Sequence, residues 1–313
     1  MFYFFGGLGI FLYGIHEMSE AMEQLFAGRF RQRLMHLVSG RFRAIALGCG
    51  ITGVVQSSTV VTVMIVSLVE AGLLPLRQAF DLIMGANVGT TVTAWMISMK
   101  QLPSVPWLMP ALAAGGFLCM AWKRFPWKRQ AELAMGFGLL FLGLDWMEEG
   151  ITAGNGLDGI LQWVLAMGEK PLAGILAGIV LVCIIQSSSA GIGILQVLAL
   201  SGQISWSAAV YLTLGQNIGT CLTTLLAGVS LGAEAKAAAR FHLIFNLAGV
   251  VVLAPVCAAF FSLNTQIAAQ PITPTGLALF HTVFNVVSVA GVYPFVGKLA
   301  KWEARRIQSE VLS

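Results

Sequence analysis

Gln56-Ser57-Ser58-Thr59 is followed, after an apolar stretch, by Gly85-Ala86-Asn87-Val88-Gly89-Thr90-Thr91. The chain then repeats this pair of motifs as Gln186-Ser187-Ser188-Ser189 and Gly215-Gln216-Asn217-Ile218-Gly219-Thr220-Cys221. In each copy the asparagine lies 31 residues after the first glutamine, and the two copies are 130 residues apart. Uncharged polar clusters held in matched register within an apolar chain predict the two halves of one site.

The composition indicates an all-α integral membrane protein. Of 313 residues, 57% are hydrophobic and only 10% are charged, which is typical of chains that cross a bilayer as helices. The net charge of +4 requires no nucleic-acid partner, because the basic residues cluster in connecting loops. The cysteines have no CxxC spacing and are expected to be buried free thiols rather than a disulfide framework or metal site. They are Cys49, Cys119, Cys183, Cys221 and Cys257.

The chain predicts two repeats within one transmembrane transporter domain that covers residues 1–313. Residues 7–14 resemble residues 136–143, which extends the repetition beyond the polar motifs. We therefore expect a first repeat over 1–122, a second over 130–262, and an added helix over 275–297. A two-fold repeat of this size is typical of transporter folds. Apolar segments fall at 2–22, 44–69, 78–99, 105–122, 132–147, 171–200, 206–231, 240–262 and 275–297, of which 44–69 and 171–200 are long enough to be bent hairpins.

Loop charges predict that the two repeats are inverted in the membrane. Loop 27–43 carries five arginines and no acid, so it should be cytoplasmic, with the N-terminus outside. The equivalent loop 148–170 carries four acids and one lysine, so it should be external. Basic residues also place the linker between the repeats and the C-terminus inside. If every apolar segment crossed the membrane once, the number of crossings in each repeat would not match the sides predicted for its loops. One segment in each repeat must therefore enter the membrane and return to the same side. The Gln-Ser-Ser segments are the candidates.

A re-entrant or broken helix at membrane depth suits an anion beside a cation. Its N-terminus offers free N–H groups and a partial positive charge. Serine and threonine hydroxyls can cap that end and contact a ligand, while Asn and Gln carbonyls suit an alkali cation. No Lys or Arg is near either motif in the sequence. Because burying an isolated anion is costly, a bound oxyanion should depend on a co-bound cation.

The paired motifs resemble those of the sodium/phosphate cotransporter family, the type II Na/Pi symporters and their bacterial relatives. The family's Arg-x-His-x-x-Phe-Asn pattern also appears at residues 240–246, with a partial echo at 281–285. The sequence departs from the family at Thr59, Gln216 and Cys221. Many bacterial relatives carry a PhoU-like domain after the membrane part, which this sequence lacks, so regulation through such a domain is in doubt. The resemblance implies a multi-pass cell-membrane symporter that moves inorganic phosphate with Na⁺ as the coupling ion and has no other cofactor.

The motifs and the resemblance together give the expected roles. No residue is expected to be catalytic, and no transition-metal site is expected. The phosphate contacts are expected to be Ser57, Ser58, Thr59, Ser187, Ser188 and Ser189. The sodium ligands or residues that orient the helix ends are expected to be Gln56, Asn87, Thr90, Thr91, Gln186, Asn217 and Thr220.

Other readings remain open at this stage. The same architecture could carry another oxyanion or export phosphate, or it could be a non-transporting membrane scaffold or receptor. An enzyme is disfavoured, since the sequence offers no nucleophile–base pair, metal-ligand cluster or nucleotide loop. A homo-oligomer is left open.

Individual residues also have plainer structural readings. The Gly-x-x-x-Gly spacings at 85–89 and 215–219 suit helix packing as well as binding. Asp81 is either a functional intramembrane acid or part of a surface ion pair. His242 and His281 are read as hydrogen-bonded structural residues rather than proton carriers.

Overall fold

The computed structural model of the protein describes residues 2–37, 40–152 and 165–312, without the side chains of 26–37 and 310–312. Within these residues the regular structure is helical, apart from one isolated bridge between Ser205 and Pro271. Three spans are long and apolar enough to cross a membrane: Leu76–Gln101, Ala233–Leu263 and Pro274–Ser309. The prediction of an all-α membrane protein is therefore confirmed at this level. Several charges used to orient the loops, among them Asp158, lie outside the described residues.

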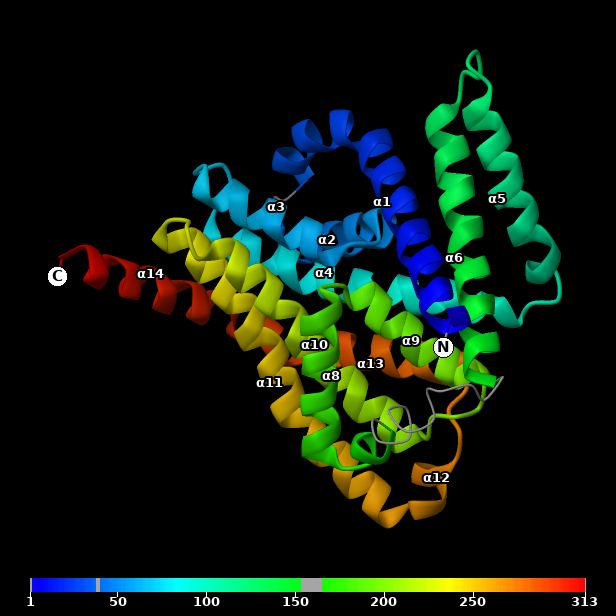
Figure 1. The fold of residues 1–313 in the computed structure, drawn as a ribbon. Coiled ribbons are helices and arrows are strands. Elements are labelled where there is room, and N and C mark those ends of the chain that lie inside the picture. The colour runs from blue at the N-terminus through cyan, green and yellow to red at the C-terminus, as the bar shows by residue number, and fades with distance from the viewer. Residues whose placement is uncertain (1, 38–39, 153–164, 313) are drawn as a thin grey trace.

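Two sets of three helices have matching lengths at the predicted offset of 130 residues. Each set has a helix of 15 residues, one of 13 and one of 23, in that order. The first set is α2 (Arg41–Val55), α3 (Ser58–Glu70) and α4 (Leu76–Ser98), and the second is α8 (Pro171–Ile185), α9 (Ser188–Leu200) and α10 (Trp206–Gly228). Figure 1 shows α4 and α10 crossing the middle of the molecule.

Each Gln-Ser-Ser motif breaks a helix at the same place. Gln56 (φ 58°, ψ 16°) and Gln186 (φ 60°, ψ 18°) are the described non-glycine residues with positive φ. After each glutamine a serine caps the next helix: the Ser57 hydroxyl accepts from Val60 N at 3.3 Å, and the Ser187 hydroxyl accepts from Ala190 N at 3.2 Å. The expected hairpin segments 44–69 and 171–200 are thus each divided into two helices.

Helices α1 (Phe2–Leu37) and α6 (Lys128–Thr152) pack against each other through the similar stretches 7–14 and 136–143. A Cβ atom on Gly7 would lie 2.6 Å from Met147 N, and one on Gly136 would lie 2.6 Å from Met18 N. The stretches 7–14 and 136–143 therefore face each other. The remaining helices are α5 (Val105–Ala121), α11 (Ala233–Leu263), α12 (Thr265–Ala269), α13 (Pro274–Val292) and α14 (Val296–Leu312), with the 3-10 turns η1 (Met99–Gln101) and η2 (Tyr293–Phe295).

Glycines let the long helices α4 and α10 lie directly against the first arm of each hairpin. A Cβ atom on Gly85 would collide with the Ile45 carbonyl oxygen, and one on Gly215 would collide with the Ile175 carbonyl oxygen. Both glycines thus serve the close helix packing that the Gly-x-x-x-Gly spacing indicates.

We predict that Gly85→Ala lowers the midpoint of thermal unfolding of the purified protein in detergent. The added methyl group must push the α2 backbone away from α4, and overpacking of this kind costs about 1–3 kcal/mol. Gly50→Ala is the matched control, because a Cβ atom there meets nothing within 4 Å. Equal unfolding midpoints for the two variants would contradict this account of the packing.

Candidate functional site

The two motifs meet at a small, partly open cavity of about 10 Å³. That space holds about one water molecule. It lies where the second arms of both hairpins begin, beside the middles of α4 and α10. Its lining residues are Ser58, Asn87, Thr90, Ser188, Gln216, Asn217, Thr220 and His281.

Six of the thirteen predicted site residues line this cavity, and they come in equivalent pairs. Both copies contribute the serine at the start of the hairpin's second arm, the motif asparagine and the threonine three residues later. The six are Ser58, Ser188, Asn87, Asn217, Thr90 and Thr220.

The other seven predicted residues support the site from outside the lining. The hydroxyls of Ser57 and Ser187 cap helices α3 and α9, and the Thr91 hydroxyl donates to the Val88 carbonyl oxygen at 2.7 Å. Ser189 donates to the carbonyl oxygen of Gln56 at 3.0 Å, so the second motif touches the first. The remaining three are Gln56, Thr59 and Gln186, none of which lines the cavity.

The two glutamines differ in their surroundings although their backbone angles agree. Gln56 is buried, and its side-chain oxygen accepts from the Thr93 hydroxyl at 2.8 Å. Gln186 is exposed, and its side-chain nitrogen donates to the Cys183 carbonyl oxygen at 3.2 Å. The helix break at Gln56 is therefore held by a hydrogen bond from another helix, whereas the break at Gln186 is exposed.

Sequence reasoning missed two lining residues, Gln216 and His281. In the sequence Gln216 is a departure from the family motif, and His281 is interpreted as a structural residue rather than as part of the site. In the structure the Gln216 side-chain nitrogen and the His281 Nδ1 atom are buried without a hydrogen-bond partner, as is the Ser58 hydroxyl. Buried polar groups are normally hydrogen-bonded, so unpartnered donors at one cavity indicate a ligand that accepts hydrogen bonds.

A buried polar network extends from the cavity to α11. Asn246 donates to the Asn87 side-chain oxygen at 3.1 Å, and its own side-chain oxygen is buried without a partner. His242 lies 3.1 Å from the Thr224 hydroxyl, which lies 3.0 Å from that of Thr62. His242 is therefore hydrogen-bonded through Nδ1 as predicted, while its Nε2 atom is buried without a partner. The same prediction for His281 is not supported at Nδ1, which has no partner. Asn246 instead offers a free oxygen of the kind that an alkali cation prefers.

Two expectations require correction. The surface ion pair considered for Asp81 is wrong, because its carboxylate is only 2% exposed and lies 3.5 Å from Arg41 Nε. The sequence could not show this, since Arg41 comes from a different helix. All five cysteines are free as predicted, but only Cys221 is buried, and the other four are partly exposed. Their apolar neighbours lie on helix faces that the protein leaves partly open.

Comparison with known proteins identifies the family. The Na⁺/Pi-cotransporter family matches residues 10–149 and 152–285, so each match covers one set of helices. The chain is 30% identical over 278 residues to YqeW of Bacillus subtilis, an uncharacterized protein, covering 89% of both chains. It is 26% identical over 306 residues to YjbB of Escherichia coli K12, provisionally named an inorganic phosphate export protein, covering 97% of this chain and 55% of that one.

A shorter match links the chain to human proteins. It is 28% identical over 172 residues to the human sodium-dependent phosphate transport protein 2C, covering 47% of this chain and 27% of the human one. No solved structure matches the chain. The family is one of transporters, and its membership accounts for the many apolar helices. The chain is a multi-pass membrane protein that belongs to the Na⁺/Pi-cotransporter family.

Proposed function

We propose that this protein is a sodium-coupled transporter of inorganic phosphate that works by alternating access around the central cavity. The observation that carries the proposal is the meeting of both Gln-Ser-Ser hairpins at one cavity with unpartnered donors. Membership of a phosphate transporter family supports the substrate class.

Phosphate would bind between the starts of α3 and α9. Ser58 and Ser188 are the first residues of these helices, and both line the cavity. Helix N-termini favour anions, and the unpartnered nitrogen of Gln216 adds a donor. Ser57, Thr59, Ser187 and Ser189 would act mainly by shaping these two ends.

Sodium would supply the positive charge that the cavity lacks. No Lys or Arg is among its lining residues. The lining does include side-chain oxygens from Asn87, Thr90, Asn217 and Thr220, which are ligand types that an alkali cation accepts. Gln56, Thr91 and Gln186 would orient the helix ends around the ions. Because an uncompensated buried anion is costly, phosphate and sodium should bind together.

The fold would consist of two inverted repeats, over 1–122 and 130–262, with an added helix within 275–297. The hairpin arms of 15 and 13 residues are about 22 and 20 Å long, short of a bilayer core of about 30 Å. A helix pair that enters the membrane and returns to the same side adds no crossing, so the number of crossings in each repeat would then match the sides predicted for its loops. The loop charges then place the two hairpins on opposite sides of the membrane.

Sodium-coupled uptake is the first test. We expect proteoliposomes to accumulate radiolabelled phosphate under an inward sodium gradient and not under a matched potassium gradient. Export is the second candidate, favoured by the similarity to YjbB, and loading the vesicles with phosphate and reversing the gradient measures it. Equal flux with either cation would overturn the sodium coupling. Absence of flux, together with no thermal stabilisation by phosphate and sodium, would favour the scaffold reading.

In the same assay we expect Ser188→Ala to reduce phosphate flux about tenfold while expression stays normal. This is the loss expected when one hydrogen bond to a charged ligand is removed. Ser201→Ala is the control: it lies at the end of the same helix, and its hydroxyl bonds the carbonyl oxygens of Val197 and Leu198 in that helix. Unchanged flux in Ser188→Ala would remove this residue from the site.

His281 and His242 should respond differently to substitution, although they share the same sequence pattern. We expect His281→Gln to reduce phosphate flux about tenfold with little change in the unfolding midpoint, because its ring faces the cavity. His242→Gln should lower the unfolding midpoint, because this fully buried ring bonds Thr224 and does not line the cavity. Equal flux in His281→Gln and the parent protein would contradict the assignment.

The unequal surroundings of the two glutamines support alternating access. In repeat proteins of this kind, the two halves exchange conformations as the site opens to one side and then to the other. The residues equivalent to Thr93 and Ser189 are Thr223 and Thr59. In the opposite state they would hold Gln186 as Thr93 and Ser189 hold Gln56 here.

We therefore predict that, in the purified protein in detergent, Gln186→Cys reacts readily with a water-soluble thiol reagent in the state described, whereas Gln56→Cys is protected. Both variants are made in a background lacking the five natural cysteines. Conditions that reverse the protein's state should slow labelling at 186 and speed it at 56. Labelling that changes in the same direction at both positions would contradict the exchange.

A further inference from the structure

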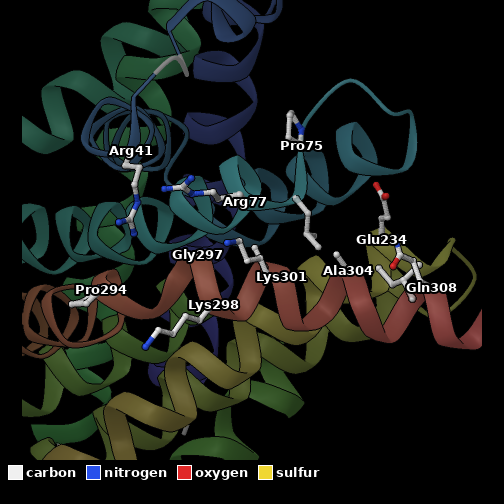
Figure 2. A pocket seen from close by; sticks show the side chains of 13 residues that line it. Arg41, Pro75, Arg77, Glu234, Pro294, Gly297, Lys298, Lys301, Ala304 and Gln308 are labelled. Atoms are coloured by element: carbon white, nitrogen blue, oxygen red, sulfur yellow. The ribbon is translucent and has the colours of Figure 1, made fainter.

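A second, larger cavity lies at one edge of the molecule, where α14 crosses the starts of α2, α4 and α11. It encloses about 780 Å³. Arg41 lines it from α2, Arg77 from α4 and Glu234 from α11, while residues 294–308 form the opposite wall. Figure 2 shows Arg41 and Arg77 facing α14 across the gap, with Lys301 extending from α14 toward them. This cavity shares no lining residue with the central one.

The cavity carries an excess of positive charge. Its lining contains four basic residues, Arg41, Arg77, Lys298 and Lys301, against the single acid Glu234. In the part of the chain that the structure describes, no ion pair involves Arg77, Lys298 or Lys301. Arg41 is paired with buried Asp81, which leaves Arg77, Lys298 and Lys301 as the excess positive charge. Like charges around one cavity repel each other, and an anion between them would relieve that repulsion.

The walls are held in place by buried charges that do not depend on a ligand. The Arg41 guanidinium lies 3.7 Å above the Tyr293 ring, donates to the Tyr293 carbonyl oxygen and is paired with buried Asp81. Glu303 of α14 is 2% exposed and pairs with Arg240 of α11 at 2.6 Å. These contacts fix α14 against the bundle, so the basic side chains are positioned in advance of binding.

Helix ends add to the positive potential. Helices α2, α4 and α11 begin at the cavity after Gly40, Pro75 and Gly232, and none of these residues provides a side-chain cap. Uncapped N-termini beside cationic side chains form a setting suited to a phosphate group.

The position of α14 indicates where that phosphate comes from. It follows α13, a helix apolar enough to cross the membrane, and buries Val296, Ala300 and Glu303 against the bundle. Trp302 and, just before the helix, Phe295 are more than half exposed, next to lysines. Aromatic and basic residues on one amphipathic helix are typical of the membrane interface, at the depth of lipid headgroups.

We propose that this cavity binds an anionic phosphate group, and that an acidic phospholipid headgroup is its source. The cavity is separate from the transport site, so the proposal stands apart from the proposed function. Free phosphate offers the same chemistry, and an acidic protein segment is a different kind of occupant. Both are outcomes that the experiment distinguishes.

The test is a thermal-shift titration of the purified protein in detergent and sodium-free potassium chloride, which leaves the sodium-dependent central site unfilled. The probes are dioctanoyl phosphatidylglycerol, dioctanoyl phosphatidylcholine, inorganic phosphate and polyglutamate. We expect phosphatidylglycerol to stabilise the protein and phosphatidylcholine to have little effect. Arg77→Gln/Lys301→Gln should bind phosphatidylglycerol about tenfold to thirtyfold more weakly.

The control is Arg305→Gln/Lys123→Gln, which removes the same charge from exposed positions outside the cavity. It should bind like the parent, and Arg77→Lys/Lys301→Arg should retain most of the affinity, which separates charge from misfolding. Equal affinity in Arg77→Gln/Lys301→Gln and the control would overturn the proposal. Stabilisation by inorganic phosphate alone, lost in Arg77→Gln/Lys301→Gln, would overturn the lipid source and keep the phosphate site. Stabilisation by polyglutamate alone would overturn both.

Discussion

The structure depends on breaking a helix inside the membrane without leaving backbone groups unsatisfied. At Gln56 and Gln186 the chain enters the left-handed region, which costs about 1–3 kcal/mol for a residue other than glycine. The following serines cap the new helices, and Gly85 and Gly215 let neighbouring helices lie against the hairpins. The break at Gln56 is buried among the surrounding helices, whereas the break at Gln186 is exposed. The two breaks create the helix ends at which we propose that the anion binds.

Much of this arrangement could be predicted from the sequence, because the pair of polar motifs occurs twice in the chain. The repetition at 130 residues predicted the two hairpins, and the break falls at each Gln-Ser-Ser motif. The facing directions of neighbouring hydroxyls could not be predicted. The hydroxyls of Thr90 and Thr91 both bond carbonyl oxygens of their own helix, yet only Thr90 lines the cavity, and this depends on where the neighbouring helices lie. The place of His281 in the cavity lining could not be predicted from the repeats, because this residue comes from α13, outside both of them.

A repeated sequence does not by itself determine which half is closed. Gln56 and Gln186 have the same local structure, yet one is bonded to Thr93 and Ser189 and the other is exposed. The difference must come from elements that occur once, such as the network that joins Asn246 of α11 to Asn87. In the proposed cycle, these single-copy contacts would set the energy difference between the two states, while the repeats would keep it small. A transporter needs this balance, since both states must be populated in each cycle.

The two cavities differ in charge, and the difference has a physical reason. The central one has no Lys or Arg in its lining, whereas the peripheral one has four basic residues. A fixed cation at the centre would bind phosphate without sodium, and the flux of phosphate would then no longer be coupled to the flux of sodium. In the proposed mechanism a neutral centre makes the anion depend on the mobile cation, so the absence of fixed charge there would couple them. The peripheral cavity has no such constraint, and permanent positive charge suits a ligand that stays bound.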